Sequence, residues 1–308
     1  MNRLDADVNG DWLVDVTLNG LAAPKGVALG SAKVAGAVRD CSMTFGGGVR
    51  TFTAAAWLDT GPADDVLSAP WIGSFSIGGR KDNPGTKTVN EALRGDMQAD
   101  VDLSGVGAPK GMALGTFKVA GLADGNISVA AGGVGAITAG RWNSGSVEAD
   151  WLVSMTTSRD RLDAAVNGDW LANLTLTGLA APKGAALNSV KVAGAIRDCS
   201  ALIGGNVNML SAGELLNADV LLGAAALTGS ADDFSVPGGR NEFTLKSLQL
   251  TGILDAPGGV AWAMKDSDVA AWTIGAFKAA GSAANSRLQY HVLITDKGPT
   301  AGLLRSAV

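Results

Sequence analysis

The sequence predicts an all-β protein, a single-stranded parallel β-helix (β-solenoid) of about 15 rungs with roughly 20 residues in each. Three observations predict this fold. Long stretches of the chain repeat, short alternating phrases that end in glycine recur along it, and small residues dominate its composition. Hydrophobic residues make up 47% of the 308, 43 residues are glycine, and only 5% are aromatic. Such a composition suits a narrow core that is built again in every rung.

The long repeats are the most informative feature. Residues 3–41 match residues 161–199 at a constant offset, with 30 of 39 positions identical. A third copy starts near residue 95, and a decayed copy covers residues 253–290. Because these copies account for much of the chain, we expect one continuous β-solenoid domain over residues 1–308.

Within each copy, short phrases alternate between apolar and polar residues and close on glycine. Leu114–Gly121 reads LGTFKVAG, and Phe117 and Val119 there should point to one face while Lys118 points to the other. Two such strands in about 20 residues leave no room for helices. A propeller or sandwich would need sharp reversals such as Asn-Gly in every repeat, and these do not recur once per rung. Stacked parallel strands therefore fit better than hairpins.

Two kinds of segment interrupt the regular succession of strand phrases. Residues 80–87 are polar and rich in turn formers, which indicates a loop that leaves the stack. An Ala-Pro-Lys-Gly element recurs at 23–26, 108–111 and 181–184, with a variant at 256–259. Because proline cannot donate to a sheet ladder, we expect a corner or excursion between strands at each copy.

Charge and cysteine usage exclude several classes of protein. The net charge is −5 with both signs scattered along the chain, so no basic stripe is present for nucleic acid. No apolar run approaches the roughly 18 residues of a membrane span. Cys41 and Cys199 occupy equivalent places in the long repeat, too far apart for a disulfide, and we interpret both as small buried hydrophobic residues rather than reactive thiols.

Two motifs resemble metal or catalytic sites and are better explained as strands. Asp5, Asp7 and Asn9 begin like a calcium loop, but the position that should close the cage is Val16. The alternation around Asp5 and Asp7 instead places them on the outside of a strand. His291 is the one histidine, which excludes a site with several histidines. We predict no metal, cofactor or catalytic residues.

Carboxylates are the chemical groups that stay open as candidates. Asp64-Asp65 and Asp232-Asp233 are acidic pairs, each followed by Gly-Gly-Arg, and a groove containing them could act on glycosidic bonds. The accompanying residues are Arg80, Asp82, Arg240 and Glu242. Solvated turns are the simpler explanation. Arg94-Gly95-Asp96 and the sequons at Asn126 and Asn173 are discounted in the same way. The eight tryptophans recur at strand ends, either buried at corners or exposed to stack on sugars.

The phrases IGSFSIGG (72–79), VGAITAG (134–140) and LTLTG (174–178) resemble those of the large secreted bacterial parallel β-helix repeat proteins, the adhesin-like or autotransporter-like surface proteins. The resemblance implies an extracellular or cell-surface location. As the function we expect a non-enzymatic structural or adhesive segment. We expect polysaccharide or other surface components as partners. We also expect end-to-end self-association, because the terminal rungs of a solenoid expose an open edge of unpaired N–H and C=O groups. Residues 1–7 lack the features of a signal peptide, which suggests an excerpt or a mature fragment. The alternative function is a carbohydrate-active enzyme or sugar-binding module that uses surface carboxylates.

Overall fold

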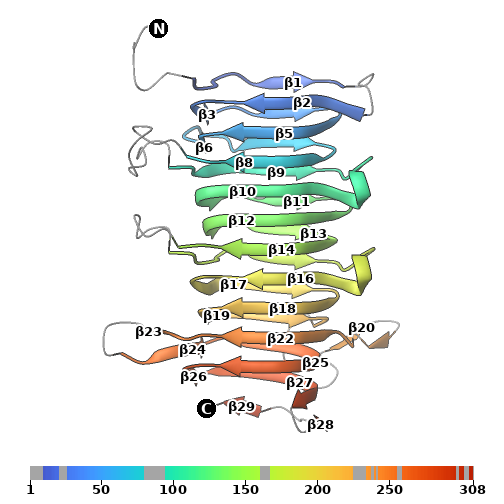
Figure 1. Ribbon diagram of the computed structural model, residues 1–308, viewed down its shortest axis with the longest axis vertical. Coiled ribbons are helices and arrows are strands. Elements are labelled where there is room, and N and C mark those ends of the chain that lie inside the picture. The colour runs from blue at the N-terminus through green and yellow to red at the C-terminus, as the bar shows by residue number, and fades with distance from the viewer. Residues whose placement is uncertain are drawn as a thin grey trace. The chain divides into compact units, whose positions relative to one another are not determined.

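A computed structural model describes most of the chain (Figure 1). The described residues are 10–20, 26–79, 94–159, 167–224, 234–236, 239–240, 242–254, 259–295, 298–301 and 305–307. The chain divides into two compact units, Met1–Ser146 and Val147–Val308, and each is described by itself. The expectation of one continuous domain over residues 1–308 stays a prediction.

Unit 1 is a coil of short strands in which each turn contributes to three parallel stacks. The first sheet stacks β1 (Val16–Leu18), β4 (Met43–Phe45), β7 (Asp65–Ala69), β9 (Met97–Leu103) and β11 (Ile127–Val129). The second sheet stacks β2 (Val27–Lys33), β5 (Gly48–Ala54), β8 (Ile72–Ile77), β10 (Met112–Asp124) and β12 (Gly133–Ser144). The third sheet stacks β3 (Ala37–Arg39), β6 (Ala56–Leu58), the start of β9 and the ends of β10 and β12.

Unit 2 repeats this plan. Its first sheet stacks β15 (Asn173–Leu176), β17 (Ala195–Ile203), β19 (Glu214–Leu222), β25 (Asp268–Ala279) and β27 (Ser286–Thr295). Its second sheet stacks β14 (Trp151–Thr157), β16 (Ala185–Lys191), β18 (Asn206–Ala212), β22 (Thr244–Leu250) and β25. The starts of β17 and β19, then β24 (Ala261–Lys265) and β26 (Ser282–Ala284), form the third. The predicted parallel β-solenoid is confirmed, and the described residues include no α-helix.

A column of aromatic rings fills the core of unit 1. Phe52, Phe75 and Phe117 stack on successive strands of the second sheet, with ring centroids 5.4 and 5.2 Å apart. Trp57 and Trp142 flank the column, with centroids 5.6 Å from Phe52 and Phe117 respectively. Each such pair contributes about 0.5–1.5 kcal/mol beyond burial of its area. Phe117 is 1% exposed while the side chain of Lys118 is exposed, so the predicted alternation is confirmed.

A Gly-Asp dipeptide that occurs in three of the long repeats ties its own rung to the next. In unit 1, Asp96 Oδ1 accepts a hydrogen bond from the backbone N–H of Leu122 at 2.8 Å, and Asp11 Oδ1 accepts one from Ala37 at 2.7 Å. In unit 2, Asp169 Oδ1 accepts one from Ala195 at 2.8 Å. Each donor follows a glycine whose hypothetical Cβ would overlap the Asp oxygen; these glycines are Gly36, Gly121 and Gly194. Packing therefore explains the Gly-Asp of Arg94-Gly95-Asp96 without an integrin-type role.

The recurring Ala-Pro-Lys-Gly element forms a short 3-10 turn. In unit 1 this turn is η3 (Pro109–Gly111), which lies between β9 and β10, and in unit 2 it is η4 (Pro182–Gly184), which precedes β16. The expected corner is therefore present at both of these copies. Most of the first copy and of the variant at 256–259 lie outside the described residues, as do residues 80–87.

Unit 2 departs from a regular coil in two places. Phe234, which belongs to an insertion between β19 and β22, is 2% exposed and packs with Leu221, Ala270 and Trp272. This insertion includes the antiparallel pair β20 (Ser235–Val236) and β21 (Gly239–Arg240). Further along, β28 (Gly298–Ala301) and β29 (Arg305–Ala307) pair antiparallel with β27. These strands satisfy part of an edge that we expected to be open. End-to-end association stays a prediction.

Within the described residues the structure has no helix of the length and apolar character that a membrane span requires.

Replacing Gly121 by alanine should destabilise the protein, because the new Cβ would overlap the Asp96 carboxylate and press on the backbone around Gly95. We expect a loss of about 2 kcal/mol in the free energy of unfolding, measured by denaturant titration. Gly30→Ala is the matched control, since a Cβ there meets nothing within 4 Å, and it should change stability by less than about 0.5 kcal/mol. Equal stability of the two variants would contradict the proposed overlap.

Candidate functional site

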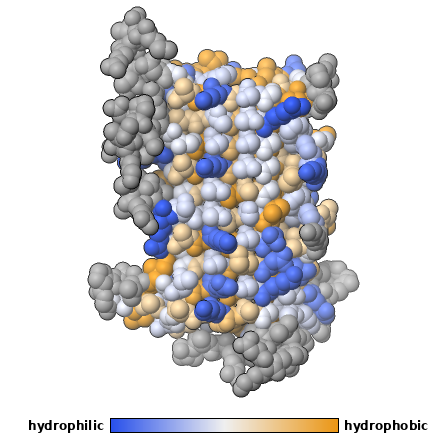
Figure 2. Space-filling model, in the orientation of Figure 1, coloured by the Kyte–Doolittle hydropathy of each residue, from blue (hydrophilic) through white to orange (hydrophobic). Residues whose placement is uncertain are grey.

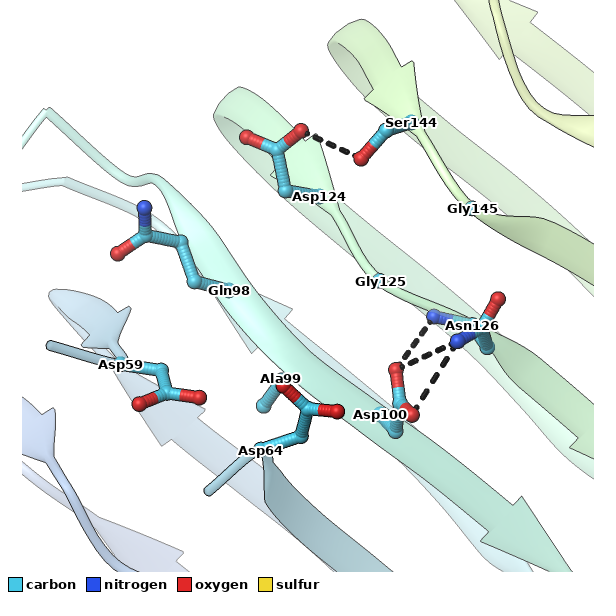
Figure 3. Close-up of a pocket in the computed structure, with 10 residues that line it drawn as sticks. All are labelled: Asp59, Asp64, Gln98, Ala99, Asp100, Asp124, Gly125, Asn126, Ser144 and Gly145. Carbon is cyan, nitrogen blue, oxygen red and sulfur yellow. Dashed lines mark hydrogen bonds between the residues drawn. The ribbon is translucent and has the colours of Figure 1, made fainter. Parts of the chain in front are cut away.

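An acidic groove of ≈ 290 Å³ in unit 1 is the candidate site (Figure 3). It contains the predicted candidate Asp64 together with three carboxylates that the sequence did not single out. We call it the acidic groove, and its polar lining consists of Asp59, Asp64, Gln98, Asp100, Asp124, Asn126 and Ser144.

The groove follows the corner at which the third sheet turns into the first. Successive rungs contribute the turn between β6 and β7, then β9, then the turn after β10, and then the turn after β12. Gly125 and Gly145 make the last two turns with φ of 138° and 101°, a region that favours glycine. A Cβ on Gly145 would overlap the carbonyl oxygen of Gly125, so the turns stack closely and bring their polar neighbours into one line.

Two carboxylates of the groove are used to hold the next rung (Figure 3). Asp100 Oδ1 accepts hydrogen bonds from the backbone N–H of Asn126 at 2.8 Å and from its Nδ2 at 3.0 Å. Asp124 Oδ1 accepts from Ser144 Oγ and from Asn143 Nδ2, both at 2.9 Å. Asn126 Oδ1 in turn accepts from Ser146 Oγ at 3.0 Å. These side chains form a polar ladder along the corner.

Asp59, which lines the groove, and Asp40 both stabilise turns. Asp59 accepts from the backbone N–H of Gly61 at 3.0 Å and of Asp65 at 3.1 Å. Asp40 accepts from the backbone N–H of Thr60 at 2.6 Å and from its hydroxyl at 3.0 Å. The N–H and hydroxyl of Thr60 stabilise the charged form and hold the pKa of Asp40 below its usual range.

The Asp64-Asp65 pair is split between solvent and core. Asp64 is exposed in the groove and has no hydrogen-bond partner among the described residues. Asp65 is 4% exposed and accepts a hydrogen bond from Trp57 Nε1 at 2.9 Å. Its burial raises its pKa, and the indole N–H of Trp57 opposes the rise. Our interpretation of the pair as a solvated turn is therefore wrong for Asp65, which lies in phase with buried Leu67 and Ala69 of β7.

The remaining carboxylate candidates do not add to this groove. Arg80, Asp82, Asp232 and Asp233 lie outside the described residues, and Glu242 is exposed in unit 2. Of the supposed calcium loop, Asp5, Asp7 and Asn9 also lie outside the described residues. Asp11 forms a salt bridge with Arg39 Nε at 2.9 Å, in addition to its bond to Ala37. No cluster of three His, Cys, Asp or Glu suited to a metal ion occurs within the described ranges.

Burial decides the tryptophan question. Six of the eight are buried, and Trp12 and Trp262 are partly exposed. The buried six cannot offer a ring face to a sugar; they are Trp57, Trp71, Trp142, Trp151, Trp170 and Trp272.

Both sequon asparagines make hydrogen bonds between rungs. Those of Asn126 are described above, and Asn173 Oδ1 accepts from the backbone N–H of Ser200 at 2.9 Å. The backbone of His291 lies in β27.

Both thiols are protected and no disulfide joins them. Cys41 is buried and Cys199 is partly buried, and each is free. Burial raises the pKa of Cys199 to about 12 and raises that of Cys41 as well. Because the thiolate is the reactive form, both behave as small apolar residues, as the sequence indicated.

Comparison with known proteins found no matching family model, no similar curated protein and no similar solved structure. The geometry and chemistry of the chain itself are therefore the basis for assigning a function.

The buried Asp65 carboxylate should make stability depend on pH. Because its pKa is raised in the folded state, the folded protein binds this proton more tightly than the unfolded chain does. The stabilisation is complete below the ordinary value of 3.8 and is lost as the pH rises from there through the raised pKa. Asp65→Asn keeps an oxygen for the Trp57 indole and removes the proton. The difference in unfolding free energy between the native protein and this variant should therefore fall with rising pH.

Denaturant titrations at closely spaced values between about pH 3 and 8 measure this difference. Thr44→Ala, an exposed and non-titrating position on the same sheet, is the control and should leave the pH profile unchanged. A difference between the native protein and Asp65→Asn that stays constant across this range would contradict the buried carboxylate.

Proposed function

We propose that this chain is a non-enzymatic structural or adhesive segment of a bacterial cell-surface or extracellular repeat protein. The observation that supports it is the repetition of similar outward side chains in register. On the second sheet of unit 1, one column runs through Lys33, Thr53, Ser76, Lys118 and Thr138. A parallel column runs through Ser31, Thr51, Ser74, Thr116 and Ala136.

Such columns suit multivalent contact rather than a single reaction centre. Adjacent strands lie about 4.8 Å apart, and these columns present a hydroxyl or ammonium group at nearly every step of the stack. Each contact with a repeating ligand is weak, but linked contacts act at high effective concentration. A long polymer or an ordered surface is the kind of partner that benefits from this arrangement.

The carboxylates also favour a structural role. Asp100 and Asp124 hold the following rungs, Asp59 and Asp40 hold turns, and Asp65 bonds to the core tryptophan Trp57. A general acid or base must be free to exchange a proton with a substrate. Most acids of the groove are already committed to the fold as hydrogen-bond acceptors.

A carbohydrate-active enzyme or sugar-binding module is the second candidate. The acidic groove favours it, because Asp64 is exposed there and lacks a partner among the described residues. Glycoside cleavage needs two carboxyl groups on either side of the scissile bond, one of them able to donate a proton.

Adhesion can be tested by displaying the chain on beads and measuring retention on surfaces coated with individual polysaccharides. We expect weak binding by the free chain and retention of the beads at least about 100-fold stronger, because multivalent display multiplies weak contacts. Beads that display the chain after heat denaturation are the control. The adhesive proposal would be abandoned if native and denatured beads were retained equally on every surface.

Turnover is tested on the same polysaccharides by the release of reducing ends. We expect none, because the groove's carboxylates other than Asp64 serve the fold. Reproducible cleavage that disappears in Asp64→Asn and persists in Glu148→Gln would establish the enzyme instead. Glu148 is an exposed acid that does not line the acidic groove, so it controls for the loss of one negative charge.

A further inference from the structure

The outward side of the second sheet in unit 1 has a charge opposite to that of the whole chain. Its strands are β2, β5, β8 and the adjoining parts of β10 and β12, residues 112–119 and 133–139. These segments contain no aspartate or glutamate. They contain three exposed cations, Lys33, Arg50 and Lys118, although the chain has a net charge of −5. We call this surface the second-sheet face of unit 1.

The acids of unit 1 gather on other surfaces. Asp40, Asp59, Asp64, Asp100 and Asp124 follow the corner between the third and first sheets, where the acidic groove lies. Among the described residues, Lys33, Arg50 and Lys118 form no salt bridge and no side-chain hydrogen bond. The positive charge of the face is therefore not neutralised by neighbouring side chains of the described chain.

The rest of this face is small and rich in hydroxyl groups. Five serine or threonine side chains accompany the cations on β5, β8 and β10; these are Thr51, Thr53, Ser74, Ser76 and Thr116. Gly73, Gly115 and Gly135 stack along one margin, where a Cβ would overlap a carbonyl of the preceding rung. Figure 2 shows the result, a pale surface of intermediate hydropathy with separated hydrophilic spots.

Unit 2 has the same property. Its second-sheet strands contain no acid over residues 151–157, 185–191, 206–212, 244–250 and 273–279. They contain three exposed lysines, Lys191, Lys246 and Lys278, together with serines at 154, 189, 211 and 247. β16 lies in the copy of residues 3–41, so Lys191 is the repeat counterpart of Lys33, and the absence of acids is kept in both copies.

We propose that the second-sheet face of each unit binds an acidic polysaccharide of the uronic acid type. The lysine and arginine side chains would pair with its carboxylates, and the serine and threonine hydroxyls would hydrogen-bond to its sugar hydroxyls. This proposal rests on the proposed adhesive function, and it adds the chemical class of the ligand. Charge complementarity is the reason for an acidic polymer: a neutral one would gain nothing from a face that excludes every carboxylate.

The spacing of the cations agrees with such a polymer. Lys33 and Lys118 share one column and are three strand steps apart, which is about 14 Å. A duplex nucleic acid has about one charge per 1.7 Å, and it would require a denser basic surface than this. A polysaccharide with a carboxylate only at intervals, and with hydroxyls between, matches both the wide spacing and the hydroxyl-rich surface.

The experiment measures binding of sodium polygalacturonate to the full chain by affinity electrophoresis and calorimetry, with neutral dextran in parallel. We compare the triple variant Lys33→Gln, Arg50→Gln, Lys118→Gln with a second triple variant, Lys191→Gln, Lys246→Gln, Lys278→Gln. The matched control removes three cations elsewhere, Lys110→Gln, Arg159→Gln and Lys265→Gln, which are not on either face. Circular dichroism and thermal melts confirm that all variants fold.

We expect each face variant to weaken polygalacturonate binding about tenfold, and the two combined to abolish it, while the control stays within about threefold of the native chain. Binding should also weaken as salt is raised. Equal weakening by the control would show that only net charge matters and would overturn the proposal. Retention on dextran that the face variants leave unchanged would overturn the acidic ligand but leave the adhesive function intact.

Vesicles of phosphatidylcholine with phosphatidylserine provide the remaining comparison, since an anionic lipid surface offers negative charge without sugar. Binding to these vesicles without binding to polygalacturonate would overturn the polysaccharide assignment. No binding to any polysaccharide would overturn this inference and the adhesive function together.

Discussion

Each rung is hydrogen-bonded to the next at a fixed strand separation, and most of the molecule depends on this constraint. A parallel stack in register places each residue over its counterpart, so a position must repeat in size and in polarity. Inside unit 1 the constraint produces the column of Phe52, Phe75 and Phe117. At the corners it produces carboxylates that accept from the rung after them, as Asp100 does from Asn126. On the outer surface of the sheets, the side chains of one column need not be alike.

Acids and cations are therefore used differently in this chain. Aspartate is short and accepts hydrogen bonds only, which suits the backbone N–H groups exposed at tight turns. Most of the described acids lie at such corners, and their charge is partly satisfied there. The lysines of the second sheets are long and lie on open strands, where their charge is available to a partner. Because aspartates lie at the corners and lysines on the open strands, a chain of net negative charge has faces of positive charge.

The fold class could be predicted because its signals are local and repeated. Alternation across Phe117, Lys118 and Val119 identifies a strand, and the spacing between phrases identifies the stack. The burial of Asp65 could have been recognised from the same alternation, since it is in phase with Leu67 and Ala69. The acidic groove could not be predicted, because it joins four rungs of unequal length. The turn at Pro109–Gly111 lengthens one rung, so Asp100 and Asn126 are 26 residues apart while Asp124 and Ser144 are 20 apart. The packing of Phe234 on Leu221 could not be predicted either, because it depends on an insertion that has no counterpart in the repeats.

The bond between the Gly-Asp dipeptide and the next rung has a consequence for how such a chain can grow. Asp11 and Ala37 are 26 residues apart, as are Asp96 and Leu122 and also Asp169 and Ala195. A duplication of the aspartate's rung alone would place one copy of that aspartate next to a rung that lacks the glycine. The smallest segment that can be copied with this contact intact spans two rungs. Residues 3–41 and 161–199 each contain both partners. Copying both rungs together preserves the contact in each copy.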